Sequence, residues 1–274
     1  KRILISGRLK EQTSRSMRSK PELEVLVPQW PAPANVKAFF TLRSGGLSAG
    51  AYGAEDGFNG LNLGDHVEDS PYAVKANRAM VTEMIGSEAA WLRQIHSTIV
   101  LEADQVKDAP QADAAFTTYS KVPCVVMTAD CVPVLFCEKN GKAVAAAHAG
   151  WRGLADGVLQ ACVEAMSGKL EDSSAEIMAW IGPHIRKESF EIREDVADYY
   201  RNSKLSGVCG EAIEKKADGS MRLDLSIFVR EALRLSGVSE VYDCGLDTFS
   251  DPKRFYSYRR SGRTGRHGAF IYKL

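Results

Sequence analysis

The sequence lacks several features that would place the protein in a specialised class. No apolar run approaches the roughly 18–20 residues that a transmembrane helix needs. The first residues also lack the apolar segment of a signal peptide. Lysine and arginine together number 35, and so do aspartate and glutamate, so the basic excess that is typical of a nucleic-acid-binding protein is missing. We therefore expect neither a membrane nor a nucleic acid as a partner.

Cysteine and histidine are also scarce. Six cysteines among 274 residues are too few for a disulfide scaffold. Most of them lie in apolar surroundings, where a reduced thiol behaves as a small hydrophobic side chain. A reducing compartment is therefore expected, and we predict a cytoplasmic protein. The five histidines limit the kind of metal site that the chain can build.

Charge is unevenly distributed along the chain. The first twenty residues carry seven positive charges and one negative charge. We expect residues 1–22 to form a basic, mobile tail. Residues 23–274 contain no linker, internal repeat or low-complexity segment, which predicts a single folded domain.

Strand and helix patterns alternate through the folded part, and hairpins are mixed among them. Asn140-Gly141 is a strong hairpin signal, and apolar residues recur at helical spacing between Leu154 and Met166. A long glycine-rich loop is expected over residues 43–64. Strands are predicted at Val36–Leu42, Val122–Met127, Val132–Cys137, Ala143–Ala147, Ile177–Ile181, Glu240–Cys244, Phe255–Tyr258 and Phe270–Tyr272. The pattern favours an α/β or α+β domain with mixed β-sheets flanked by helices.

Three short segments carry polar residues that could bind a metal or take part in a reaction: Gln94 to Ser97, Thr128 to Pro133, and His148 to Gly153. Two of them place a polar residue at the end of a predicted strand, where α/β proteins often build their sites. His96, Cys131 and His148 could supply three ligands and leave a fourth position for water or substrate, as catalytic zinc sites do. The same cysteine and histidines could instead form a nucleophile and its base. Their spacing does not separate these interpretations.

Other residues near these segments could bind an anion or transfer a proton. The helix that begins after His148 carries Arg152 and small neighbours, an arrangement that suits phosphate. Arg43 is a second candidate for phosphate, and Gln94 is a candidate for substrate binding. Asp130 stands beside Cys131, where it could orient a ligand or move a proton. Each of these residues could equally have a structural role.

These motifs resemble the laccase-domain proteins, also described as YfiH-like, polyphenol oxidases or purine nucleoside phosphorylases. The likeness runs from about Thr41 to Leu274. The segments that carry it are Thr41 to Ser48, Asn62 to Val67, Asn77-Arg78, Gln94 to His96, Thr128 to Cys131, His148 to Gly153, Ile181 to Pro183, Phe255 to Arg260 and Thr264 to Arg266.

The resemblance implies a single-domain α/β sandwich and a metal site, usually zinc, formed by His96, Cys131 and His148. It implies phosphorolysis of adenosine, inosine, guanosine or methylthioadenosine, and deamination of adenosine. Copper-dependent oxidation of phenols at the same site is an alternative, as is amide hydrolysis of peptidoglycan precursors. A non-enzymatic binding module fits the polar segments poorly, and the sequence does not indicate an oligomeric state.

The chain departs from the family pattern at two places. Asp247-Thr248 stands where the family usually has Cys-Thr, and Cys244 lies three residues earlier. We expect Asp247 to affect stability or substrate affinity rather than to carry the reaction. The glycine-rich loop also looks longer here, between Gly53 and Gly60, which could shape the entrance for the substrate.

Overall fold

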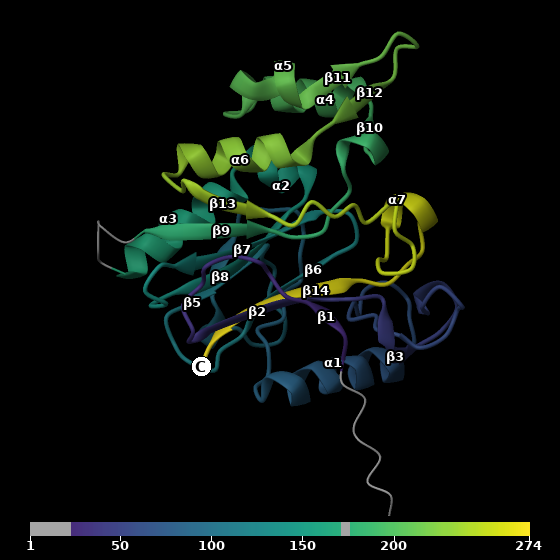
Figure 1. Cartoon of the computed structure of the whole chain (residues 1–274), viewed down its shortest axis with the longest axis vertical. Coiled ribbons are helices and arrows are strands. Elements are labelled where there is room, and N and C mark those ends of the chain that lie inside the picture. Colours follow the sequence, from purple (N-terminus) through teal and green to yellow (C-terminus); the bar gives the residue numbers. More distant parts are fainter. Residues whose placement is uncertain (1–22, 171–175) are drawn as a thin grey trace, which may run out of the picture.

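Two β-sheets and several helices stack in layers in the computed structural model, which describes residues 23–170 and 176–274 (Figure 1). The expected basic tail, residues 1–22, lies outside the described residues. No helix within the described ranges is long and apolar enough to cross a membrane. All six cysteines are free thiols, as the sequence predicted.

The larger sheet has six strands in the order β13-β9-β7-β8-β5-β4. The β4–β5 and β9–β13 pairs are parallel, and the other neighbours are antiparallel, so the sheet is mixed as expected. The predicted hairpin at Asn140-Gly141 connects β7 to β8, and Gly141 has a φ of 71°. The strands are β4 (Val100–Glu102), β5 (Ala114–Thr117), β7 (Val132–Glu138), β8 (Val144–Ala149), β9 (Ile177–Ile181) and β13 (Glu240–Asp243).

The second sheet has four strands in the order β1-β2-β14-β6 and packs against the first. Alternate residues of β6 and β14 point to opposite faces. Val126 and Ile271 belong to the core between the sheets, whereas Val125 and Phe270 pack toward α1. Successive side chains of a strand point to opposite faces of the sheet, so a strand that is covered on both faces is apolar at every position. The bounds are β1 (Val25–Leu26), β2 (Val36–Thr41), β6 (Cys124–Thr128), β14 (His267–Lys273) and α1 (Pro71–Ile85).

Helices cover the other face of the six-stranded sheet. α2 (Trp151–Asp156), α3 (Val158–Leu170) and α6 (Leu225–Leu235) bury their apolar sides against it. The sequence predicted one helix over the first two, but Gly157 adopts a φ of 105° and separates them. The left-handed conformation is accessible to glycine without a steric penalty. The break lets α2 keep its own direction above the end of β8.

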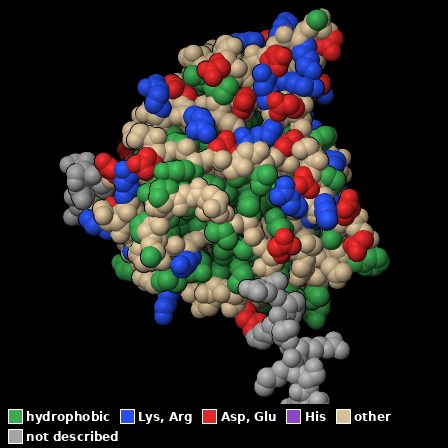
Figure 2. Space-filling view, in the orientation of Figure 1, with side chains coloured by type: hydrophobic (Ala, Val, Ile, Leu, Met, Phe, Trp, Pro, Cys, Tyr) green, Lys and Arg blue, Asp and Glu red, His purple; other side chains and the backbone are tan. Residues whose placement is uncertain are grey.

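A small third sheet lies beyond α6, with the order β10-β12-β11, next to α4 and α5 (Figure 1). Charged side chains gather over this end of the molecule (Figure 2). Its elements are β10 (Glu191–Ile192), β11 (Ile213–Lys215), β12 (Met221–Leu223), α4 (Glu194–Arg201) and α5 (Cys209–Ala212). The segment that includes β10 and the start of α4 extends toward the end of β8 and helps to form the cavity described below.

Two of the secondary-structure predictions are wrong. The glycine-rich stretch contains a strand, β3 (Ser44–Ser48). The predicted strand Phe255–Tyr258 is irregular chain followed by a short helix, α7 (Tyr258–Ser261). Ser257 caps this helix by accepting a hydrogen bond from the Arg260 backbone N–H at 3.2 Å. The capping hydroxyl favours a helix start over continued strand.

Candidate metal centre

Three side chains from separate segments meet at one end of the six-stranded sheet. Cys131 lies in the turn between β6 and β7, and His148 lies near the end of β8, opposite Pro133. His96 comes from the segment before β4. Their ligand atoms all lie within 4.8 Å of one another, and the two imidazole rings are 4.8 Å apart, centre to centre. The structure thus brings together the three residues that the sequence singled out.

The close approach of these residues depends on a glycine at the start of α2. A Cβ atom at Gly150 would lie 2.2 Å from Nδ1 of His96 and 3.4 Å from Sγ of Cys131. Such distances leave no room for any side chain there. His96 and Asp130, the residue before Cys131, have positive φ values of 60° and 93°. Non-glycine residues in this conformation are uncommon and often mark functional sites.

The donor set fits a transition metal. Two imidazoles and a thiolate are ligands that zinc binds, and they also suit copper. Burial lowers the pKa of His96 to about 4, helped by the positive charges of His148 and Arg152. His96 is therefore neutral near pH 7, which is the form that binds metals.

His148 behaves differently because its neighbours are anionic. Burial alone would lower its pKa, but the interactions with Cys131 and with the Asp113 carboxylate raise it to about 9. Without a metal, His148 is therefore protonated near pH 7, and it lies next to Cys131. This pair would also suit a nucleophile and its base. A metal ion must displace the proton in order to bind, so its affinity falls at low pH.

Asp113 is a functional candidate that the sequence analysis missed. Its Oδ1 accepts hydrogen bonds from Nδ1 of His148 at 2.8 Å and from the His96 backbone N–H at 3.0 Å. Its Oδ2 accepts from the backbone N–H groups of Ile95 and Ser97 and from the Ser97 hydroxyl. Burial would raise the pKa of Asp113, but the bonds from His148 and Ser97 lower it to about 2. One buried carboxylate therefore orients two of the three candidate ligands.

The signal for Asp113 was present in the sequence, since it is a lone carboxylate in the run Ala112-Asp113-Ala114-Ala115. A charged residue in such a run is rarely fully buried unless it is paired. Because Nδ1 of His148 is engaged by this carboxylate, Nε2 is the ring nitrogen that would be left to hold a metal ion. A carboxylate that accepts a hydrogen bond from the other ring nitrogen in this way fixes the tautomer and orientation of metal-binding histidines.

The three candidate ligands line a cavity of about 1160 Å³. Four aromatic side chains and three arginines contribute to its walls: Trp151, Phe190, Phe249, Tyr258, Arg193, Arg259 and Arg266. Gln94 and His66 also line it. Three carboxylates, Asp130, Glu191 and Asp195, also belong to the wall. The cavity therefore offers flat apolar surfaces and charged groups of both signs next to the candidate metal group, a combination that suits an aromatic substrate with polar groups.

The predicted substrate residues have different surroundings. Gln94 lines the cavity, but its amide pairs with β6 through the backbone N–H and C=O of Met127, at 2.6 and 2.7 Å. Arg43 donates to the carbonyl oxygens of Gly53 and Pro252 and is not part of the cavity wall. Arg152 is exposed and lies over the Trp151 ring at 4.9 Å. It too is absent from the cavity wall.

Asp130 connects the Cys131 turn to the C-terminal segment. Its carboxylate accepts hydrogen bonds from the hydroxyls of Thr248 and Ser257, at 2.7 and 2.9 Å, and from the Arg259 backbone N–H at 2.6 Å. Both oxygens are thus occupied by bonds that hold this turn in place. The geometry fits a residue that positions Cys131 and the cavity wall.

Asp247, which replaces the usual family cysteine, also holds the cavity wall together. It accepts hydrogen bonds from the backbone N–H groups of Arg186 and Phe249 and from the Ser189 hydroxyl, at 3.3, 2.9 and 2.7 Å. Ser189 and Phe249 line the cavity, whereas Asp247 does not. Cys244 is also absent from the wall.

Comparison with known proteins identifies the family. Residues 37–273 match the family model described as multi-copper polyphenol oxidoreductase laccase. The chain belongs to this family. A Pseudomonas aeruginosa protein named purine nucleoside phosphorylase is 43% identical over 253 residues, which cover 90% of this chain and 97% of that protein. Escherichia coli purine nucleoside phosphorylase YfiH is 35% identical over 92% of this chain and 99% of its own length.

Solved structures of this laccase family share the fold. The crystal structure of a Neisseria meningitidis protein aligns with a TM-score of 0.82 at 44% identity, covering 91% of this chain and 98% of its own. A Geobacillus stearothermophilus protein, YlmD, aligns with a TM-score of 0.78 at 27% identity, covering 91% and 99%. The mixed α/β fold expected from the sequence is therefore confirmed.

The histidines of this laccase-family chain limit its metal chemistry. His184 and His267 are fully buried, and each is hydrogen-bonded on both ring nitrogens. The remaining three, His66, His96 and His148, line the cavity. A trinuclear copper cluster needs many more histidine ligands than this. The family's multi-copper description thus does not match the ligands that this chain offers, which suit a single metal ion.

Proposed function

We propose that this protein is a metal-dependent purine nucleoside phosphorylase that also deaminates adenosine. The observation that carries the proposal is the His96, Cys131 and His148 group, which lines a cavity of about 1160 Å³ whose walls also hold four aromatic side chains. Two of its relatives bear the name purine nucleoside phosphorylase. Adenosine, inosine, guanosine and methylthioadenosine are the proposed substrates of phosphorolysis.

The cavity walls support a purine substrate. A purine is a flat, weakly polar ring system that stacks on aromatic side chains. Phe190, Phe249, Tyr258 and Trp151 supply such surfaces within one cavity. Pockets that bind drug-sized ligands have volumes from about 300 Å³ upward. The cavity is larger than this minimum, so it has room for a nucleoside and a phosphate ion together.

The proposed metal is zinc, with copper as the alternative. A metal ion held by this group would act as a Lewis acid and would activate water for attack at C6 of adenine. The protein's own residues do the positioning: Asp113 orients His148 through Nδ1, and Asp130 holds the turn that carries Cys131. In this proposal His96, Cys131 and His148 act as metal ligands.

The function is tested by incubating zinc-loaded protein with adenosine, with and without inorganic phosphate, and resolving the products by chromatography. We expect adenine to appear only when phosphate is present and inosine to appear in both samples. Failure to form either product would contradict the proposal. Oxidation of a phenol by the copper-loaded protein, without any nucleoside turnover, would favour the polyphenol oxidase alternative, and hydrolysis of a peptidoglycan precursor would favour the amidase.

A matched pair of cysteine variants separates the site from general effects. Cys131→Ala should abolish both products because it removes a proposed ligand. Cys209→Ala, in α5 and absent from the cavity wall, should leave both rates unchanged. Equal loss of activity in the two variants would show that the cavity is not the reaction site.

A further inference from the structure

Arg266 differs from the other two arginines of the cavity wall in its burial, because Arg193 and Arg259 are exposed whereas Arg266 is half-buried. Its Nη1 donates to the carbonyl oxygens of Thr264 and Gly265, at 3.0 and 3.1 Å. No carboxylate within residues 23–170 and 176–274 forms an ion pair with it. By contrast, Arg78 pairs with Asp65 at 3.2 Å. A half-buried guanidinium without an anionic partner, in the wall of a cavity, is suited to bind an anionic ligand.

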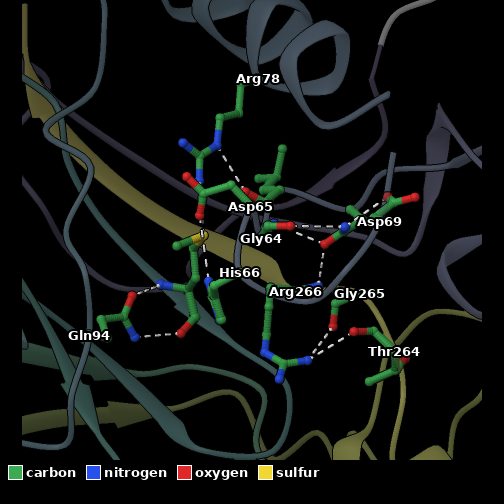
Figure 3. Close-up of polar contacts among 12 residues, drawn as sticks. Gly64, Asp65, His66, Asp69, Arg78, Gln94, Thr264, Gly265 and Arg266 are labelled. Atoms are coloured by element: carbon green, nitrogen blue, oxygen red, sulfur yellow. Dashed lines mark hydrogen bonds and ion pairs between the residues drawn. The ribbon is translucent and has the colours of Figure 1, made fainter. Parts of the chain in front are cut away.

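The surrounding loop holds Arg266 in place. Its backbone N–H donates to Oδ1 of Asn62 at 2.8 Å, and the same oxygen accepts from the Gly64 backbone N–H at 2.9 Å. A Cβ atom at Gly64 would lie 2.8 Å from Cγ of Arg266, so the glycine lets the arginine stem pack against the loop. Asn62 also donates to Asp69 at 2.9 Å. These contacts fix the stem before any ligand binds (Figure 3).

His66 adds a second donor beside this guanidinium. Both side chains line the cavity, His66 from the loop before α1 and Arg266 from the segment before β14 (Figure 3). Burial and the positive charge of Arg266 lower the pKa of His66, against the opposing effect of Asp65. An oxygen of Asp65 lies 3.6 Å from Nδ1 of His66, so Nε2 is the ring nitrogen left to contact a ligand. Tyr258 completes this corner, with its ring centre 5.7 Å from the guanidinium carbon of Arg266.

This corner is within electrostatic reach of the candidate metal group. Burial lowers the pKa of Arg266, and the charges of Cys131 and Asp130 partly offset that effect. The other basic candidates are placed less well. Arg152 is exposed and lies outside the cavity wall, and Arg193 and Arg259 belong to the wall but are exposed to solvent.

We propose that Arg266, assisted by His66, binds the inorganic phosphate that is consumed in nucleoside phosphorolysis. The inference rests on the proposed function and places the phosphate at Arg266 rather than at Arg152 or Arg43. In the reaction an oxygen of hydrogen phosphate bonds to C1′ of the ribose while the C1′–N9 bond breaks. The electron pair of that bond and the phosphate proton pass to the base, which leaves ribose 1-phosphate and the free purine.

The test measures phosphate binding and turnover separately. Inorganic phosphate is titrated into the zinc-loaded protein without nucleoside, and its affinity is followed by calorimetry. We expect Arg266→Gln to weaken binding by about 10- to 100-fold, the range typical of a lost charge-assisted contact, and Arg266→Lys to restore part of it. In turnover assays the KM for phosphate should rise by a similar factor in Arg266→Gln, whereas the KM for nucleoside should change less than about 2-fold.

Two controls make the result specific. Arg263→Gln changes an arginine of the same segment that bonds to Tyr52 and is absent from the cavity wall. Arg152→Gln tests the rival position. Neither should change phosphate affinity. His66→Gln, which leaves Arg266 intact, should weaken binding by a smaller factor than Arg266→Gln and provides a second test if that variant folds poorly.

Each outcome bears on one hypothesis. Unchanged phosphate affinity in folded Arg266→Gln, or the loss of affinity in Arg152→Gln alone, would overturn the subsite. The absence of any phosphate binding by the wild type would overturn it as well. Phosphate binding that depends on Arg266, in a protein that releases no base from any nucleoside, would sustain the subsite and reject the proposed phosphorolysis.

Discussion

The carboxylate of Asp113 offers the sharpest test of how the metal group is held. The Asp113→Asn substitution keeps the size of the side chain and replaces one acceptor oxygen by an NH₂ group. If the NH₂ takes the place of Oδ1, it faces the N–H groups of His96 and His148. If it replaces Oδ2, it faces the N–H groups of Ile95 and Ser97. Either orientation leaves two buried donors without an acceptor.

The magnitude follows from these contacts. A buried donor left without a partner costs about 1–3 kcal/mol, so two donors lower the free energy of unfolding by about 2–6 kcal/mol. The loss of a carboxylate that orients a metal-binding histidine lowers metal affinity by about 10- to 100-fold. We therefore expect Asp113→Asn to be less stable and to bind zinc more weakly, because His148 is no longer fixed in its binding tautomer.

Zinc affinity is measured by competition with a chromophoric chelator, on protein that circular dichroism shows to be folded. The control is Asp104→Asn, an exposed aspartate ahead of β5. It should bind zinc like the wild type. If folded Asp113→Asn bound zinc as tightly as the wild type, the orienting role of this carboxylate would be refuted.

Three further predictions follow from packing, backbone contacts and burial. Gly150→Ala should lower metal content sharply, since its Cβ would lie 2.2 Å from a ring nitrogen of His96; Gly168→Ala, with open space around it, should bind metal normally. Asp247→Ala should lower the melting temperature and raise KM while kcat stays within about 10-fold of the wild type, and a loss of turnover as deep as that of Cys131→Ala would contradict this. Burial lowers the pKa of His267 from 6.5 to about 3. As the pH falls through this range, the unfolded chain binds a proton at His267 that the folded chain does not bind, so the folded state loses stability. Denaturant unfolding should therefore show the free energy of unfolding falling between pH 6.5 and pH 3, by up to about 1.4 kcal/mol per pH unit. A His267→Gln variant with the same pH slope would reject that assignment.

The sequence predicted the parts of the fold that local patterns determine. The apolar runs correspond to β6, β7 and β8, and Asn140-Gly141 gives the hairpin because both features act over a few residues. The segment Phe255–Tyr258 was misjudged because its aromatic residues favour strands. In the folded protein Phe255 and Tyr256 are fully buried in irregular chain, and the Arg260 guanidinium binds three carbonyl oxygens around them.

The candidate site was predictable only in its ligands. His96, Cys131 and His148 stand out in the sequence because each interrupts or ends an apolar segment. The residues that support them act over long separations. Asp130, which holds the turn that carries Cys131, accepts a hydrogen bond from the Ser257 hydroxyl, 127 positions away, and no local pattern indicates such a partner. Arg266 ends one of the segments that carry the family resemblance, but its position in the cavity depends on the fold.

The central claim is that one metal ion, held by His96, Cys131 and His148, supports the chemistry of the cavity. The most direct test is to strip the protein of metal with a chelator and add zinc back stepwise, measuring bound metal and nucleoside turnover in each sample. We predict that turnover is absent without metal, rises linearly and stops rising at one equivalent, and that folded Cys131→Ala neither binds this equivalent nor recovers activity. Full turnover in metal-free protein, or stoichiometric metal retained by Cys131→Ala, would contradict the account.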